Sequence, residues 1–454
     1  MHGHDPSLEA LTDAIVRYAV ERIAMNPPPL DAPRDQSELR TVVDGTITAS
    51  GIGGLNALER FAVDLAPACI STDHPRFLSF VPAAPTEASV LFDLVVGASS
   101  IYAGSWMEGG GAIAAENAAL RWIADLAGMP MSAGGVFVSG GTAGNLSALM
   151  AARWRWRARA GGRVDSTRAL IVTSSGAHSS IAQAGMVMDA DVLAVAAEDD
   201  GRLGGDALAA ALEALDGPDR DRVCAVVATA GTTNAGIVDD LAGIAAVSEA
   251  HDLWFHVDAA YGGAALAAPS VRARFDGVER ADSLIVDPHK WLFAPFDSCA
   301  LLYRDPEIAK AAHTQHAEYL DVLHDDDVWN ASDYAHHLSR RARGLPLWFS
   351  LATYGTDAYV AAIEQTLATA HAAADLIRDD PSCELVLEPQ LSVVVFRRLG
   401  WGVADYATWS AALLDRGQAF VVPTAWQGET VLRICIVNPL TTTADIADLI
   451  ESLH

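Results

Sequence analysis

The stretch "GGVFVSGGTAGNLSALMAARWRWRAR", residues 134–159, decides the fold. It predicts a short apolar strand, a glycine turn and a long helix. The same strand–loop–helix form returns in "RALIVTSSGAHSSIAQAGMVM", residues 168–188. Strands that are almost wholly apolar and alternate with helices indicate a mostly parallel sheet that helices cover on both faces. Further strands of this kind are expected at 191–197, 222–231, 253–263, 281–290 and 299–304.

The chain has 454 residues, of which 51% are hydrophobic, so it can bury a large core. We predict three parts: an N-terminal helical segment over 1–86, a large α/β domain over 87–347 and a small α+β domain over 348–454. The small domain is expected to begin with one long helix over about 348–379. Helices are also expected near 6–25, 54–65, 88–98, 112–126, 205–215, 241–251 and 406–416, with a last one from 443.

The net charge of −28 argues against nucleic acid and anionic membranes as partners, because both require basic patches. The five cysteines are scattered without a C-x-x-C pair, so we expect reduced thiols, no disulfide framework and no zinc or other metal site. Neither a signal peptide nor a membrane-spanning run is recognisable. We therefore expect a soluble, cytoplasmic protein.

Ligands of open α/β sheets bind beyond the carboxyl ends of the strands. Polar and glycine residues come after the predicted strands at this edge, and each has a structural explanation when it is taken alone. Together they indicate a site. They are Ser139 to Asn145, His178, Thr232, Thr233, Asp258, Asp287, His289 and Lys290.

The glycine turn "SGGTAGN" opens a helix after a strand, where free N–H groups and the helix dipole can hold a phosphate. The turn is neither a Walker-type phosphate loop nor the G-x-G-x-x-G of dinucleotide folds. An equally weighted alternative is a helix start that Thr142 caps.

Asp258 ends an apolar strand, where a buried carboxylate needs a cationic partner. It either pairs with an arginine of the chain or with a protonated ring nitrogen of a ligand. Taken alone, His178 is a hydrogen-bonded core residue, but in this company it is a candidate to stack on a flat cofactor or to donate a proton. Thr232 and Thr233 are either turn hydroxyls or ligand contacts.

Lys290 lies between two apolar segments in "SLIVDPHKWLFAPFDSCA", residues 283–300. In a dry site beside cations or dipoles, we expect its pKa to fall and the amine to become nucleophilic, as in Schiff-base enzymes. A phosphate cradle, a carboxylate, an imidazole and such a lysine together describe a pyridoxal 5'-phosphate site.

The segments "VDPHKW", "HVDAAYGG", "ATAGTTNAGIVDD", "SGGTAGNLSAL" and "HSSIAQAG" resemble the motif series of the pyridoxal-phosphate-dependent group II amino acid decarboxylases. The resemblance runs from about residue 73 to residue 443. It implies the fold type I, aspartate-aminotransferase-like architecture. It further implies a homodimer with active sites at the interface, in which an N-terminal helical flap embraces the partner.

The resemblance also implies a role for individual residues. Lys290 would carry the cofactor as a Schiff base, Asp258 would pair with the pyridine nitrogen, and Ala260 and His178 would lie against the ring. The phosphate would be held by Gly141, Thr142 and His289, while Thr233 and Asp239 would lie near the Schiff base. In "AEYL", Tyr319 would donate the proton to Cα.

The presence of Tyr319 and His178 favours simple decarboxylation over aldehyde-forming oxidation, by the same resemblance. Phe80, Val81 and Pro82 resemble an aromatic-type pocket lining, whereas Tyr102 and Gly104 depart from it. Because the pocket stretch has little basic character beyond Arg76, we expect an aromatic substrate. Acidic or diamino substrates such as glutamate, aspartate or 2,4-diaminobutyrate remain the alternative.

Two other classes of protein compete with a decarboxylase. A desulfurase or another lyase on this fold requires a mobile catalytic cysteine, and Cys383 after Pro381 and Ser382 lacks such a setting. A non-catalytic homologue is disfavoured by the complete set of site residues.

Overall fold

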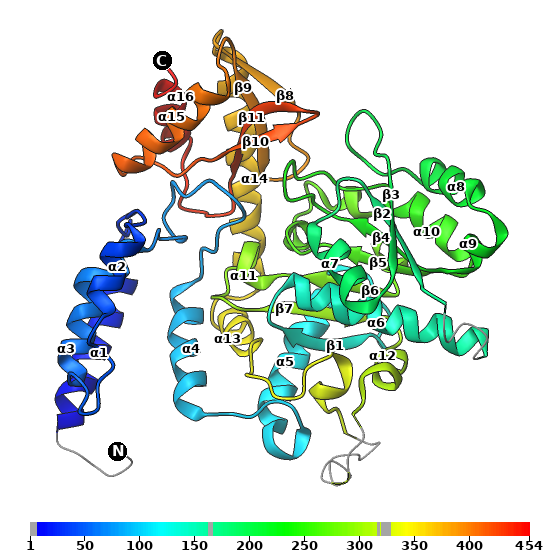
Figure 1. Cartoon of the computed structure of the whole chain (residues 1–454), viewed down its shortest axis with the longest axis horizontal. Helices are drawn as coiled ribbons and strands as arrows, with labels where there is room; N and C mark the ends of the chain where they lie inside the picture. The colour runs from blue at the N-terminus through cyan, green and yellow to red at the C-terminus, as the bar shows by residue number, and fades with distance from the viewer. Residues whose placement is uncertain (1–6, 162–166, 316–317, 319–327) are drawn as a thin grey trace.

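The structure is a computed structural model that describes residues 7–161, 167–315, 318 and 328–454. Its centre is a seven-stranded sheet with the order β1-β7-β6-β5-β4-β2-β3, in which β7 alone runs antiparallel to its neighbours (Figure 1). All seven strands lie where the apolar segments predicted them. They are β1 (Gly134–Val138), β2 (Leu170–Ser174), β3 (Asp191–Val195), β4 (Val223–Thr229), β5 (Trp254–Asp258), β6 (Ser283–Val286) and β7 (Cys299–Tyr303).

Both faces of this sheet are covered, as predicted. Along β4, Ala225 and Val227 pack in one apolar cluster with side chains of α6 and α7, whereas Val226 packs in another with side chains of α8 and α10. This alternation follows from the two-residue period of a strand. The helices of the large domain are α4 (Glu87–Ser99), α5 (Trp106–Leu126), α6 (Gly141–Ala160), α7 (Ser179–Met188), α8 (Gly205–Ala214), α9 (Gly217–Asp221), α10 (Leu241–Ala250), α11 (Pro288–Trp291) and α12 (Pro306–His313).

The C-terminal part forms a four-stranded antiparallel sheet with the order β10-β11-β9-β8, and helices pack against it (Figure 1). The elements are α13 (Leu345–Tyr354), α14 (Thr356–Asp379), β8 (Cys383–Leu387), β9 (Val393–Arg398), α15 (Val403–Asp415), β10 (Pro423–Trp426), β11 (Glu429–Cys435) and α16 (Thr443–Glu451).

The long helix expected over 348–379 is wrong, because the chain breaks it at Gly355 into α13 and α14. Gly355 adopts φ 77° and ψ 160°, a backbone conformation that glycine reaches without steric cost. The break lets α13 pack on α4 and α5 of the large domain, while α14 packs on the small sheet.

The N-terminal segment contains α1 (Ser7–Ile23), α2 (Gln36–Val43) and α3 (Gly54–Arg60), and a π-helical turn continues α3 over Phe61–Leu65. Figure 1 shows these helices as an arm beside α4. The chain then joins the small domain, where Leu78 donates its N–H to Phe420 and accepts one from Cys435. Arg76 forms ion pairs of 2.7 Å with both Asp445 and Asp448 of α16. No helix among the described residues is long and apolar enough to span a bilayer.

A buried ion pair joins α5 to the segment before α13. Arg340 and Glu116 are 5% and 2% exposed, and their closest atoms lie 2.6 Å apart. Arg340 also donates to the carbonyls of Ala103 and Phe137, and Glu116 accepts the N–H of Gly344. Since Phe137 belongs to β1, this pair ties the strand before the glycine turn to two other elements.

We predict that Arg340→Met lowers the free energy of unfolding by about 3 to 5 kcal/mol, because it leaves the Glu116 carboxylate buried without its cation. Chemical denaturation of both proteins measures the change. Arg341→Met is the matched control: Arg341 pairs with Asp93 at a half-exposed position, so its loss should cost at most about 1 kcal/mol. Equal losses of unfolding free energy in Arg340→Met and Arg341→Met would show that the buried Arg340–Glu116 pair stabilises the fold no more than the half-exposed pair does.

Candidate active site

A cavity of about 490 Å³ opens at the carboxyl ends of the parallel strands. It brings together eight of the residues to which the sequence analysis assigned a specific role, drawn from segments more than 140 positions apart in the chain. Those residues are Gly141, Thr142, His178, Thr233, Asp258, Ala260, His289 and Lys290.

The glycine turn forms the open N-terminus of α6 at the wall of this cavity. Gly140 is the N-cap residue, with φ 153°, and no side chain caps the helix, so the alternative of a cap by Thr142 does not hold. A Cβ on Gly141 would lie 3.1 Å from Asp287 Oδ2 and 3.3 Å from Ala260 Cβ. The missing side chain therefore keeps the first turn of a 20-residue helix close to the cavity, where its N–H groups suit an anion.

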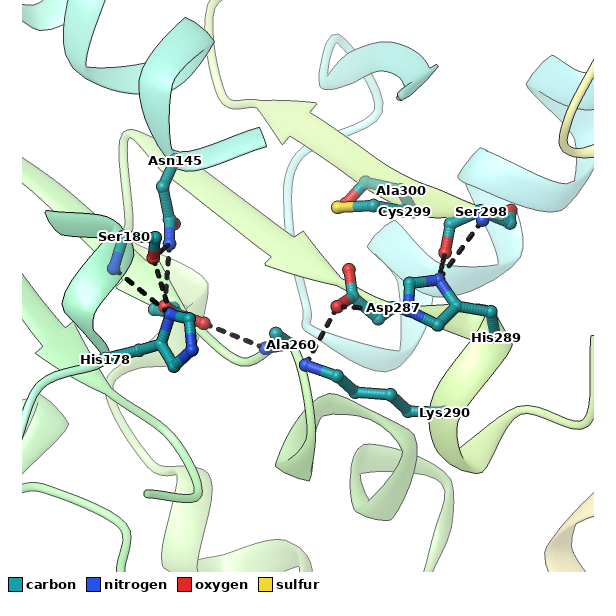
Figure 2. A network of polar contacts seen from close by, with 11 residues as sticks. Asn145, His178, Ser180, Ala260, Asp287, His289, Lys290, Ser298, Cys299 and Ala300 are labelled. Carbon is teal, nitrogen blue, oxygen red and sulfur yellow. Dashed lines mark hydrogen bonds and ion pairs between the residues drawn. The ribbon is translucent and has the colours of Figure 1, made fainter. Parts of the chain in front are cut away.

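Lys290 forms an ion pair with Asp287, whose Oδ2 lies 2.9 Å from Nζ (Figure 2). Burial lowers the pKa of Lys290, but the charge of Asp287 outweighs it and raises the pKa above its ordinary value. Burial raises the pKa of Asp287, and the charges of Lys290 and His289 bring it below its ordinary value. The expectation of a lowered lysine pKa is therefore wrong for this state of the site, because it overlooked a carboxylate three residues away.

Several polar side-chain atoms near the strand ends are buried, and only some of them are paired. His289 Nδ1 lies 2.5 Å from the carbonyl oxygen of Ser298 (Figure 2). Among the residues that the structure describes, Asp287 Oδ1, Thr229 Oγ1 and Ser298 Oγ are buried and have no hydrogen-bond partner. Buried polar atoms are usually paired, so this cluster fits a polar ligand.

Asp258 accepts hydrogen bonds from neutral groups. Asn145 Nδ2 donates to Oδ2 at 2.8 Å, and the N–H of Ala260 donates to Oδ1 at 3.1 Å. No arginine of the described chain forms an ion pair with Asp258, so the arginine alternative does not hold. The carboxylate keeps its negative charge free for a cationic group in the cavity.

His178 is the N-cap residue of α7. Its Nδ1 accepts the backbone N–H of Ser180 at 3.2 Å and lies 2.9 Å from Ser180 Oγ (Figure 2). The two threonines differ: Thr232 is buried and its Oγ1 accepts the N–H of Ile237, as a turn hydroxyl does, whereas Thr233 lines the cavity.

The other predicted residues lie elsewhere or outside the described chain. Asp239 accepts the N–H groups of Leu203 and Thr229 behind the cavity wall, and burial raises its pKa to about 6. Phe80 is 60% exposed and packs near Phe420, and Val81 and Pro82 come next on the same segment; none of the three is in the cavity lining. Tyr319 lies outside the described residues.

Tyr102 and Gly104 lie on the loop between α4 and α5, also outside the cavity lining. The Tyr102 hydroxyl donates to the Leu338 carbonyl at 3.1 Å. A Cβ on Gly104 would lie 2.5 Å from the Tyr102 hydroxyl oxygen, so the glycine makes room for this ring.

The sequence analysis included Asn145 among the residues beyond the first strand but gave it no role toward a ligand; the structure places it in the cavity lining, one turn into α6. Other residues of the lining were missed. Phe296, Asp297 and His336 also line the cavity, and the sequence gives no local indication of this.

Together the open helix start, Lys290, Asp258 and the unpaired polar atoms fit pyridoxal 5'-phosphate, with a cradle for its phosphate, an amine for its aldehyde and a carboxylate for its ring nitrogen. Residues 55–399 match the pyridoxal-dependent decarboxylase conserved domain. The chain belongs to this family, and it is a pyridoxal-phosphate-dependent amino acid decarboxylase, a carboxy-lyase.

Relatives and solved structures agree with this assignment. The chain is 30% identical to an aromatic-L-amino-acid decarboxylase of Bacillus atrophaeus, with 84% of this chain and 81% of that protein covered. It is 33% identical to an L-2,4-diaminobutyrate decarboxylase of Rhizobium meliloti, covering 84% and 77%. The crystal structure of Oryza sativa TDC with PLP and tryptamine is similar at a TM-score of 0.89 and 26% identity, covering 99% of this chain and 98% of that one.

We predict that Asp287→Asn lowers the pH at which the cofactor-free protein captures pyridoxal phosphate covalently. Capture requires the neutral amine, so its rate should rise with pH through the pKa of Lys290, which Asp287 holds high. Without that charge the midpoint should fall by about one to three pH units. Absorbance of the Schiff base after rapid mixing measures the rate.

Asp297→Asn serves as the control for this experiment, because Asp297 also lines the cavity but pairs with Arg343. Its midpoint should match that of the unmodified protein. An unchanged midpoint in Asp287→Asn would contradict the role assigned to the Lys290–Asp287 pair.

Proposed function

We propose that the substrate is an aromatic L-amino acid, which the enzyme converts to its amine and CO2. The observation that carries this proposal is the charge of the cavity wall. Among the described residues, the wall contains three carboxylates and no arginine, and its only lysine is Lys290. With Lys290 taken by the cofactor, a glutamate or aspartate side chain would find no lysine or arginine there, since Arg76 is engaged by Asp445 and Asp448.

Apolar surface is available in the same cavity. Phe296 lines it with 54% of its surface exposed, and Leu146 of α6 contributes a second apolar contact. An aromatic ring that enters such a cavity gains free energy from burial and from contact with another ring.

The bound cofactor supplies an electron sink for the pair of electrons that CO2 leaves behind. In the proposed roles, Asp258 would hold a proton on the ring nitrogen, and the N–H groups at the start of α6 would bind the phosphate. Lys290 would carry the cofactor and help to release the amine. His178 would contact the ring near the substrate carboxylate, Thr233 would contact the reacting side, and Tyr319 would donate a proton to Cα.

A diamino acid is the second candidate. The 33% identical relative acts, by its name, on L-2,4-diaminobutyrate. Asp297 lines the cavity and is half-buried in an ion pair with Arg343, so a substrate ammonium could compete for this carboxylate.

We predict that the aromatic amino acids give the highest kcat/KM when amine and CO2 are measured across the twenty amino acids, dopa, ornithine and 2,4-diaminobutyrate. Amine and CO2 should form in equal amounts. A preference for 2,4-diaminobutyrate that Asp297→Asn weakens would favour the second candidate. Aldehyde and hydrogen peroxide as the main products would contradict simple decarboxylation.

We further propose that the enzyme is a homodimer whose subunits pair through the N-terminal arm, α1 to α3, and α4. Neither α2 nor α3 contains a buried residue. Large apolar side chains are exposed on both sides of the proposed contact, which is unusual for a surface that faces water. They are Ile15, Val16, Val20, Leu55, Phe61 and Val63 on the arm, and Leu91, Leu94 and Val95 on α4.

We predict that the native protein sediments with twice the mass of one chain, and that Val20→Asp combined with Leu94→Asp yields monomers. Burying two carboxylates in an apolar interface costs more than the contact returns. Val403→Asp, which changes an apolar residue of α15 that is 70% exposed, should leave the mass unchanged. A monomeric native protein in analytical ultracentrifugation would refute the pairing.

We also propose that the enzyme works in the cytoplasm. All five cysteines are free, and four of them are buried. Free thiols persist where the surroundings are reducing.

A further inference from the structure

A row of buried polar residues runs beneath the cavity and joins β5 and β6 to α6 and α7. None of its members is more than 2% exposed. Polar side chains are buried at such positions when their hydrogen bonds are satisfied, so the row is a built network. Its members are Trp254 and His256 of β5, Ser283 of β6, Asn145 of α6 and Ser180 of α7.

The two ends of this row determine the direction of every hydrogen bond in it. At one end the indole of Trp254 can only donate, and it donates to Ser283 Oγ at 2.8 Å. At the other end the carboxylate of Asp258 accepts a hydrogen bond from Asn145 Nδ2 at 2.8 Å.

His256 lies between these ends and contacts both neighbours. Its Nδ1 lies 2.8 Å from Ser283 Oγ, and its Nε2 lies 2.8 Å from Asn145 Oδ1. Burial lowers the pKa of His256 to about 4, so the ring is neutral and carries one proton. That proton is on Nε2, because the Asn145 oxygen requires a donor while the Ser283 hydroxyl supplies one to Nδ1.

Asn145 also connects the row to His178, a second residue of the site. Its Nδ2 also donates to Ser180 Oγ at 2.9 Å, and Ser180 Oγ lies 2.9 Å from His178 Nδ1 (Figure 2). Because Nδ1 accepts the Ser180 backbone N–H, it carries no proton, and the Ser180 hydroxyl that accepts from Asn145 donates to it as well. The proton of a neutral His178 is consequently on Nε2.

We propose that His256 is a positioning residue: through Asn145 it orients the Asp258 carboxylate and, together with the Ser180 backbone N–H, keeps the proton of His178 on Nε2. This inference rests on the roles proposed above for Asp258 and His178 toward the cofactor. His256 itself does not line the cavity, whereas Asn145, Ser180, His178 and Asp258 do.

The loss of the His256 donor has a defined consequence. Without the His256 Nε2 donor, the Asn145 oxygen loses its hydrogen bond on the side away from Asp258. The amide can then rotate so that its oxygen faces Asp258. A charge-assisted hydrogen bond to the carboxylate is then lost, and the hydroxyl of Ser180 loses its fixed direction. Both the hold on the cofactor and the proton position of His178 should change together.

Three substitutions of His256 test the proposal in the full-length holoenzyme. The amide nitrogen of glutamine reaches the place of Nε2, that of asparagine stops near the place of Nδ1, and leucine has no donor. We expect His256→Asn and His256→Leu to raise the Kd for pyridoxal phosphate about tenfold, and His256→Gln to stay within about twofold of the unmodified enzyme. Cofactor loss after transfer to cofactor-free buffer is followed by absorbance.

The second readout is the ring nitrogen of His178 in protein labelled with nitrogen-15 histidine. The proton should stay on Nε2 in the unmodified protein and in His256→Gln, and should be shared with Nδ1 in His256→Asn. If His256→Leu does not fold, the comparison of His256→Asn with His256→Gln still tests the proposal. Neither readout involves an amino acid, so a wrong substrate assignment would leave both results standing.

His313→Leu is the matched control. His313 is a second buried histidine, 4% exposed, whose Nε2 bonds to the Ser147 carbonyl at 3.0 Å and whose pKa burial also lowers to about 4. Its loss should lower thermal stability but leave the cofactor affinity and the His178 proton unchanged. Equal cofactor loss in His256→Leu and His313→Leu, or in His256→Gln and His256→Asn, would overturn the proposal.

Discussion

A sheet that helices cover on both faces has little room for polar groups except at the ends of its strands. The parallel strands of this enzyme end at one edge, and the residues just beyond β1, β2, β4, β5 and β6 meet there. This constraint accounts for how Gly141, His178, Asp258 and Lys290 come to share one cavity although they are far apart in the chain. The apolar strands thus determine both the core and the place of the chemistry.

The charged side chains at this edge of the sheet interact with neighbouring groups of the same edge. Lys290 is held by Asp287, and Asp258 is held by the neutral N–H groups of Asn145 and Ala260. The first arrangement keeps a lysine protonated while the cofactor is absent. The second leaves a carboxylate whose charge is available to a cationic ring nitrogen. Asp287 and Asp258 are buried to a similar extent, but their neighbours differ: Asp287 pairs with the charged Lys290, whereas Asp258 accepts hydrogen bonds from neutral groups.

Much of the fold and half of the site were predictable from local patterns. The strands have continuous apolar runs, and the residues just beyond them are polar or glycine, so both could be read directly. Gly355 was a weaker signal, because a single glycine inside a helical pattern is often tolerated. The pairing of Lys290 with Asp287 was also within reach, since Lys290 is the third residue after Asp287 at the start of a helix. His336 and Phe296 could not be predicted, because they approach the cavity through loops whose paths depend on the packing of other elements.

By itself, the sequence determined the parallel sheet, the edge at which ligands bind and the residue types that suit pyridoxal phosphate, because these depend on periodicity and on the residues at the end of each strand. Tertiary structure alone decided which of those residues meet and in which protonation state. The orientation of the Asn145 amide illustrates this, since it depends on a row of hydrogen bonds that begins at Trp254, 109 positions along the chain. Hydrogen-bond direction is a property of neighbours in space, and no local pattern encodes it.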